Sequence, residues 1–172
     1  MAGYGAKDLA ESFRTVRRNT IQVAQDIPED QYGFRAADGA QSVGEMLAHV
    51  AAATIWAEQL HFVEKKTEVS YEDFGRYMAA GKTVAETLVS KADILAALEA
   101  RGHAFASGLE ALSDEELGRH VAFPTPIQPP SKSRFEMLLS VKEHEMHHRG
   151  QLMLMERMLG IVPHLTRARQ NR

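Results

Sequence analysis

Four segments of the chain carry apolar side chains at the spacing of an amphipathic α-helix. The first runs from about Lys7 to Asp26, and its inward positions follow one another at alternating steps of four and three residues. These positions are Leu9, Phe13, Val16, Thr20, Val23 and Ile27. The spacing places them on one stripe, which a helix must bury against another surface. No strand-like alternation of useful length accompanies these segments, so the stripes are best buried against one another.

A second helix is predicted from Ser42 to about Leu60. Ser42 and Glu45 form the S-x-x-E pattern of a capping box, which marks the start of a helix. A third helix is predicted over residues 84–112, with room for an early interruption. Its stripe consists of Ile94, Leu98, Phe105, Leu109 and Leu112.

The last long helix is predicted from about Ser133 to Leu159. Gly160 stands where a helix-ending glycine belongs, and Pro163 prevents the helix from continuing. The tail, residues 166–172, is basic and is predicted to be a frayed, solvated end.

The remaining segments are predicted to be irregular connections. Residues 28–41 are polar and follow a helix-breaking proline, residues 67–81 indicate a packed loop or short helix, and residues 113–116 start a short turn. Four prolines make residues 122–131 an extended connection. The prediction is therefore a single all-α domain over residues 1–172, a four-helix bundle with irregular connections.

Composition narrows the function classes. The chain has 172 residues, which fits one domain with its own core, and a net charge of −3, which argues against nucleic-acid binding. It has no cysteine, so disulfides, thiolate ligands and a cysteine nucleophile are excluded. No apolar run approaches the length of a membrane span, and residues 1–7 lack the apolar core of a signal peptide. A cytoplasmic, soluble protein is expected.

Three histidines occupy positions that face the predicted core. His144 and His148 are four residues apart, which directs both rings to one side of the last helix. His49 lies in the middle of the second helix's stripe, between Met46 and Ala53. Buried imidazoles are costly without partners, and one metal ion satisfies all three. We therefore predict a metal site formed by His49, His144 and His148, suited to zinc, nickel, copper or iron; hydrogen-bonded core histidines are the alternative.

The other histidines have no spacing that adds them to this site. His147 is predicted to be exposed or to lie just outside the ligands. The remaining four, His61, His103, His120 and His164, are expected at the surface.

Three further residues lie near the predicted site. Gln151 is one turn beyond His148 and could donate a hydrogen bond to a bound ligand, or simply pack. Trp56 could contact a ligand, although core packing is the more ordinary role. Glu45 could orient a ligand histidine, but the capping box is favoured.

A peptidase motif overlaps the histidine pair. Residues 144–148, with Glu145 as the acidic member, satisfy H-E-x-x-H, in which the glutamate is a general base. The metzincin continuation would need glycine and histidine where the chain has Gln151 and Leu154. No sheet is predicted that could hold an extended peptide, so a metallopeptidase is disfavoured.

Three segments resemble the DinB/YfiT-like superfamily of metal-binding four-helix bundles. They are residues 42–50 (SVGEMLAHV), residues 144–152 (HEMHHRGQL) and residues 158–163 (MLGIVP). In that family the first segment supplies one histidine ligand and the second supplies two, which here are His49, His144 and His148. Together with the helix layout, the resemblance covers nearly the whole chain.

The resemblance implies an up-down-down-up bundle, a divalent metal such as nickel, zinc or iron, and frequent homodimers. It also implies a small-molecule substrate, with either metal-dependent hydrolysis or transfer involving a low-molecular-weight thiol cofactor. Three protein ligands leave an open coordination position, which is typical of catalytic sites. A non-catalytic metal-dependent sensor and a bundle with a structural metal are the alternatives.

Overall fold

The computed structural model describes residues 3–170, and helices dominate that range. The long helices are α1 (Ala6–Asp26), α2 (Val43–Ala52), α4 (Tyr71–Thr87), α5 (Lys91–Glu110) and α7 (Arg134–Met158). The short elements are the 3₁₀ turn η1 (Glu29–Gln31), α3 (Ile55–Ala57), the π-helical turn η2 (Glu58–Val63), α6 (Asp114–Gly118), the strands β1 (His120–Ala122) and β2 (Ser131–Ser133), and α8 (His164–Gln170).

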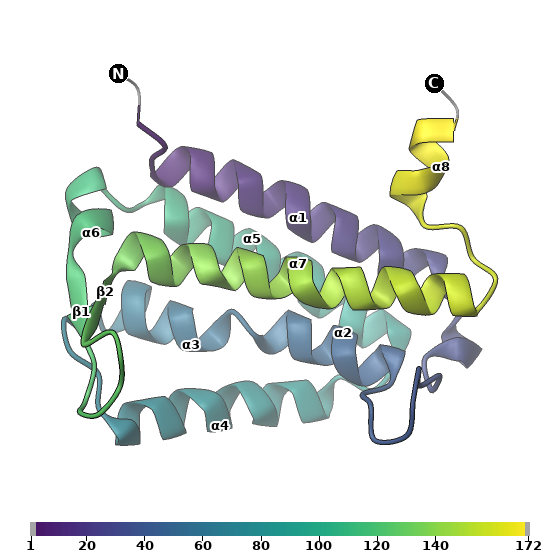
Figure 1. Ribbon diagram of the computed structural model, residues 1–172, viewed down its shortest axis with the longest axis horizontal. Helices are drawn as coiled ribbons and strands as arrows, with labels where there is room; N and C mark the ends of the chain where they lie inside the picture. The colour runs from purple at the N-terminus through teal and green to yellow at the C-terminus, as the bar shows by residue number, and fades with distance from the viewer. Residues whose placement is uncertain (1–2, 171–172) are drawn as a thin grey trace.

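Four helical rods form the bundle: α1, α2 continued by α3, α5, and α7 (Figure 1). Helix α1 lies beside α5 and α7, and α2 lies beside the same two helices. α1 and α7 run in one direction, while α2 and α5 run in the other (Figure 1). In chain order this is the up-down-down-up arrangement, so the predicted fold class is confirmed.

The predicted stripes form the core. Leu9, Phe13 and Val23 of α1 are fully buried, as is Ile27 directly after the helix. The stripe positions Ile94, Leu98, Phe105 and Leu109 of α5 are also buried, and so is Leu112 just beyond its end. Burial of these apolar faces is the main favourable contribution to the bundle's stability. Within residues 3–170, no helix combines the length and the apolar character needed to cross a membrane.

Helix α4 is a 17-residue helix where a packed loop or short helix was predicted for residues 67–81. It packs on the outside of the bundle, against α2 and α3 (Figure 1). Only Tyr77 among its described residues is buried, so α4 has no apolar stripe to detect. Its start is instead marked by a capping box, in which the Asp73 amide donates to Ser70 Oγ (3.1 Å) and the Ser70 amide donates to the Asp73 carboxylate (3.0 Å).

The third bundle helix begins later than predicted. Residues 84–87 end α4, and α5 begins at Lys91 after Ser90 and Asp93 form another capping box. The interruption expected early in residues 84–112 is therefore a complete turn between two helices.

The second predicted helix is not continuous. Helix α2 ends at Ala52, and the chain then passes through α3 into the π-helical turn η2, where the Glu64 amide donates to the Gln59 carbonyl (2.8 Å). This wider turn redirects His61 into the interior, and the surface position expected for His61 is wrong. Arg134 donates to His61 Nδ1 (3.1 Å), and burial together with the Arg134 charge lowers the pKa of His61 to about 3.

The two ends of α7 are as predicted, but its surroundings contain structure that was not. Ser133 caps the start, and Gly160 has the positive φ of a helix-ending glycine (77°). Strands β1 and β2 form a short antiparallel hairpin before α7. The expected frayed tail is wrong for residues 166–170, which belong to α8; residues 171–172 lie outside the described range.

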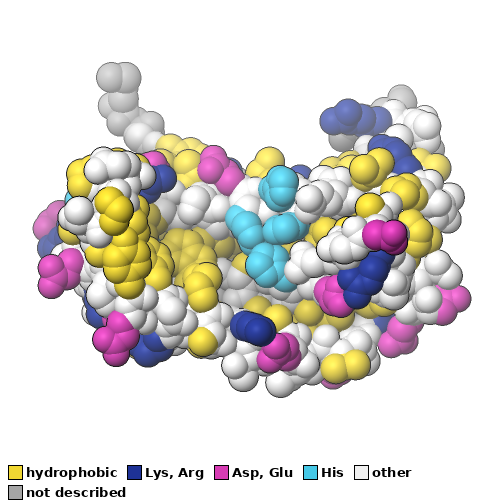
Figure 2. Space-filling model, turned by 60° about the horizontal axis from the view of Figure 1, so that its bottom comes forward, with side chains coloured by type: hydrophobic (Ala, Val, Ile, Leu, Met, Phe, Trp, Pro, Cys, Tyr) yellow, Lys and Arg dark blue, Asp and Glu magenta, His cyan; other side chains and the backbone are white. Residues whose placement is uncertain are grey.

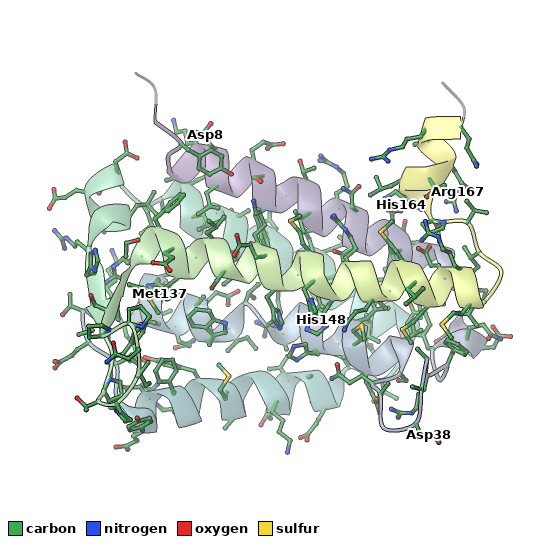
Figure 3. All side chains as sticks on the ribbon, in the orientation of Figure 1. Asp8, Asp38, Met137, His148, His164 and Arg167 are labelled. Carbon is green, nitrogen blue, oxygen red and sulfur yellow. The ribbon has the colours of Figure 1, made fainter. Side chains whose placement is uncertain are left out.

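A buried carboxyl group lies near the end of α7, close enough to α8 for the charge of Arg167 to affect it. Figure 3 places His164 and Arg167 on α8, at the end of the bundle away from Met137. Arg167 donates to Asp26 of α1 (2.6 Å) and so holds α8 in place. Glu156 is fully buried, and neither carboxylate oxygen has a hydrogen-bond partner among residues 3–170. Burial, with the nearby charge of Asp26, raises the pKa of Glu156 to about 7.

This carboxyl group should make stability pH-dependent. The pKa of Glu156 in the folded protein lies above the unfolded value of about 4.3, so its contribution is complete below pH 4 and is lost as pH rises through 7. Glu156→Gln, which cannot ionise, should gain about 3 kcal/mol relative to wild type at pH 8 and little at pH 4. Urea unfolding at both pH values measures this difference. An equal difference at both would contradict the assignment.

Candidate metal centre

Three imidazole rings converge on the hollowed face of the bundle. His49 Nε2 lies 3.1 Å from His144 Nε2, and His148 Nε2 lies 3.1 Å from the same atom. The three candidate ligand atoms all lie within 4.8 Å of one another, and the side chains are half-buried. Figure 2 shows histidine side chains gathered at the middle of this face, beside hydrophobic ones. The structure therefore brings the three predicted residues together.

Two helices position these rings. Helix α7 carries His144 and His148 one turn apart, and their ring centroids are 4.5 Å from each other. Helix α2 carries His49 across the interface with α7, with its ring centroid 5.0 Å from each of the other two. The capping box fixes where α2 begins, since the Glu45 amide donates to Ser42 Oγ (3.2 Å) and the Ser42 amide donates to Glu45 Oε2 (2.8 Å).

The site favours neutral imidazoles. Burial, together with a smaller effect of the neighbouring imidazoles, lowers the pKa of His144 to about 4. Burial is also the main cause of the lowered pKa of His49, with a smaller effect from His148. At neutral pH these rings therefore hold no extra proton, so one nitrogen of each is free to bind a metal.

Gln151 orients His148 rather than pointing at the open site. His148 Nδ1 lies 2.8 Å from Gln151 Oε1, and the amide oxygen can only accept from the ring N–H. This contact places the proton of neutral His148 on Nδ1 and leaves Nε2 with a free lone pair facing the cluster. Gln151 is itself exposed, so its contact with a bound ligand remains a prediction.

The cluster has the donor set and spacing of a metal site. Zinc–nitrogen bonds of 2.0–2.1 Å at tetrahedral angles place two ligand nitrogens about 3.3 Å apart. Both close nitrogen pairs here are 3.1 Å apart, near that value. His144 Nε2 is the atom shared by both close contacts. In a neutral ring this nitrogen has either one proton or one lone pair, so it can form a good hydrogen bond with only one of its two neighbours. One metal ion would accept a lone pair from each of the three rings. The residues present fit one divalent transition metal.

Glu145 does not belong to the cluster. Its carboxylate faces α1, where Arg17 binds it through Nε (3.0 Å) and a terminal nitrogen (2.8 Å). Both side chains are buried. Arg17 also donates to the Leu98 carbonyl of α5 (3.0 Å), and a Cβ at Gly102 would lie 2.7 Å from Arg17 Cγ, so only glycine leaves room for it. The H-E-x-x-H interpretation therefore lacks its general base.

The remaining predicted neighbours lie around the site. Glu45 is held by its capping box and by Arg35, which donates to both carboxylate oxygens (2.6 and 2.7 Å). Trp56 is half-buried and lines a cavity of about 930 Å³, which His49 and His144 also line. His147 is exposed, with its ring centroid 5.1 Å from that of His148.

The other histidines have separate surroundings. His103 and His120 are exposed, as expected. His164 is half-buried instead, with Nε2 3.2 Å from Asn19 Oδ1, because α8 folds back against α1.

Four-helix bundles commonly build metal sites from side chains on facing helices, and the three imidazoles here lie at such an interface. The family model of the DinB superfamily matches residues 12–152. The chain belongs to the DinB superfamily. The matched range contains all three histidines, and it confirms the family suggested by the sequence segments. No curated protein matches the chain.

Two solved structures from Bacillus subtilis share the fold. The DinB-like protein YjoA is 19% identical, with 88% of this chain and 91% of that chain aligned at a TM-score of 0.64. YfiT is 16% identical, with 94% and 91% aligned at a TM-score of 0.68. YfiT is described as a probable metal-dependent hydrolase with an unusual four-helix bundle topology. At these identities the likeness shows the fold alone.

Breaking the buried ion pair between Arg17 and Glu145 should strongly destabilise the protein. Arg17→Met leaves a buried carboxylate unpaired and should destabilise the protein by about 3–5 kcal/mol. The double variant with Arg17→Met and Glu145→Met removes both charges and should recover most of that loss. Urea unfolding measures both. A loss below about 1 kcal/mol for Arg17→Met would contradict the role given to the pair.

Proposed function

We propose that the protein is a hydrolase of a small molecule that depends on one divalent metal ion. His49, His144 and His148 would hold the ion, and zinc, nickel and iron are the candidates that suit imidazole. The observation that carries the proposal is the convergence of three neutral ring nitrogens at the edge of a large cavity. The proposal is also consistent with the description of YfiT.

The donor set is typical of catalytic sites. Three protein ligands leave at least one coordination position for water or substrate, whereas structural sites usually have four. When bound, a divalent ion supplies Lewis acidity, which polarises a carbonyl group and lowers the pKa of water.

The chain's own residues prepare the site for this role. Burial keeps His49 and His144 neutral, and Gln151 fixes the ring of His148. The nearby carboxylates of Glu45 and Glu145 are engaged by arginines. The uncompensated charge of a bound ion would therefore act on the substrate.

Turnover of ester and amide substrates by metal-loaded protein tests this function. Wild type should hydrolyse members of such a panel, and dialysis against a chelator should abolish the activity. His144→Ala removes a ligand and should lower the rate by about 100-fold or more, because even loss of an outer partner of a ligand costs 10–100-fold. Exposed His103, far from the cluster in the sequence, provides a control as His103→Ala, which should keep full activity.

Two results would contradict the hydrolase. Turnover that requires an added low-molecular-weight thiol would assign a transferase instead. A melting temperature that falls sharply on chelation, without turnover of any substrate, would assign a structural metal.

A further inference from the structure

The cavity beside the three histidines is long and is lined mostly by α2 and α4, with α7 contributing Ser140, Val141 and His144. Its volume is about 930 Å³, at the upper end of the range for small-molecule sites. Its lining follows α2 and α3 from Gly44 to Trp56, which spans roughly 18 Å at the helical rise. His49 lies near the middle of that length. A molecule bound here would therefore extend to both sides of the histidines.

Small side chains create the space. Ala48 and Ala52 of α2 are four residues apart and share one face, and Gly81 and Ala85 of α4 do the same on the opposite wall. Because these side chains are small, they fill little of the space beside the histidines. Figure 2 shows hydrophobic side chains in the hollow beside the histidines.

The two ends of the cavity differ in chemistry. Beyond His49, toward α3, the lining contains Trp56 and Tyr77, with Met78 at the edge. In the opposite direction it contains polar Gln41 and Ser42 together with Tyr32, Leu88 and Val89.

The charged residues of the lining do not call for a charged ligand. Glu45 is paired with Arg35 (2.6 Å), and Lys82 lies 3.8 Å from Glu86 at the exposed mouth. The end near Trp56 therefore suits an uncharged apolar group.

We propose that the natural substrate is an elongated molecule with an apolar arm, an acyl chain or aromatic group, that lies against Trp56 and Tyr77. The group that reacts would lie at His49 and His144, and the polar remainder toward Gln41 and Ser42. This rests on the proposed metal-dependent hydrolase and specifies its substrate class as esters or amides of apolar acids.

A chain-length series of hydroxamic acids tests the arm directly. Trp56 is the single tryptophan of the chain, so its fluorescence reports occupancy of the cavity. In zinc-loaded protein, the Kd should tighten about fourfold for each CH₂ added from acetohydroxamic acid upward, until the arm reaches Trp56. In metal-free protein every member should bind more weakly, with the same gain per CH₂.

Two glycines of α4 offer a matched pair of variants. Gly81 lines the cavity, and a Cβ there would lie 3.6 Å from the Ala52 carbonyl oxygen, in ordinary contact. Gly75 is exposed, and nothing lies within 4 Å of its Cβ position. Both substitutions to leucine favour the helix. Gly81→Leu should remove the gain in affinity with chain length and leave the Kd of acetohydroxamic acid unchanged. Gly75→Leu should behave as wild type.

The outcomes separate this inference from the proposed function. A Kd that is independent of chain length, or a gain that survives Gly81→Leu, would overturn the apolar arm even if short substrates are hydrolysed. A chain-length gain without any ester or amide turnover would support the arm and overturn the hydrolase. The protein could instead form a dimer that Gly81→Leu disrupts and that no hydroxamic acid dissociates. This result would show that a second copy fills the cavity, and it would overturn the inference.

Discussion

The ion pair between Arg17 and Glu145 fixes which side of α7 faces α1, and the convergence of the three histidines depends on that orientation. Arg17 crosses the bundle from α1, passes α5 at Gly102 and binds Glu145 in the interior. On a helix, residue 145 is turned by about 100° from 144 and about 60° from 148. Viewed down the axis of a four-helix bundle, the directions from one helix to its two neighbours are roughly at a right angle to each other. With Glu145 fixed toward α1, His144 and His148 must face α2, where His49 lies.

The same geometry explains why H-E-x-x-H is misleading here. The peptidase reading needs the glutamate on the side of the metal, whereas the bundle uses it to bind a neighbouring helix. Buried ion pairs contribute little net stability, because desolvation offsets the attraction, but an unpaired partner is severely destabilising. Such a pair therefore acts mainly on orientation, and Glu145 belongs to the fold rather than to the reaction.

The bundle helices could be predicted from sequence because the apolar stripe of each helix is the face that it buries in the core. Helix α4 could not, because it lies outside that core and buries only Tyr77 among its residues. Its one local signal is the spacing of Ser70 and Asp73, which matches the box formed by Ser42 and Glu45 with aspartate in place of glutamate. Missing α4 also hid the cavity, since α4 forms its second wall.

The histidine cluster was predictable for a different reason. The four-residue spacing of His144 and His148 is local information, and the position of His49 on its stripe indicates the side that faces the core. Outside the helix caps, the hydrogen-bond partners of individual polar side chains could not be predicted from the sequence. His61 is buried because η2 is π-helical, and the contact between Gln151 and His148 depends on rotamers that spacing alone does not determine.

The most direct test of the account is the metal content of purified protein and two histidine variants. Protein prepared without chelators or metal-affinity steps should contain about one divalent ion per chain. His49→Ala, which alters the helix opposite the His144–His148 pair, should lose most of that metal while remaining folded. His147→Ala, beside the pair but outside the cluster, should retain it. An equal, full metal load in wild type and His49→Ala would contradict the three-histidine centre.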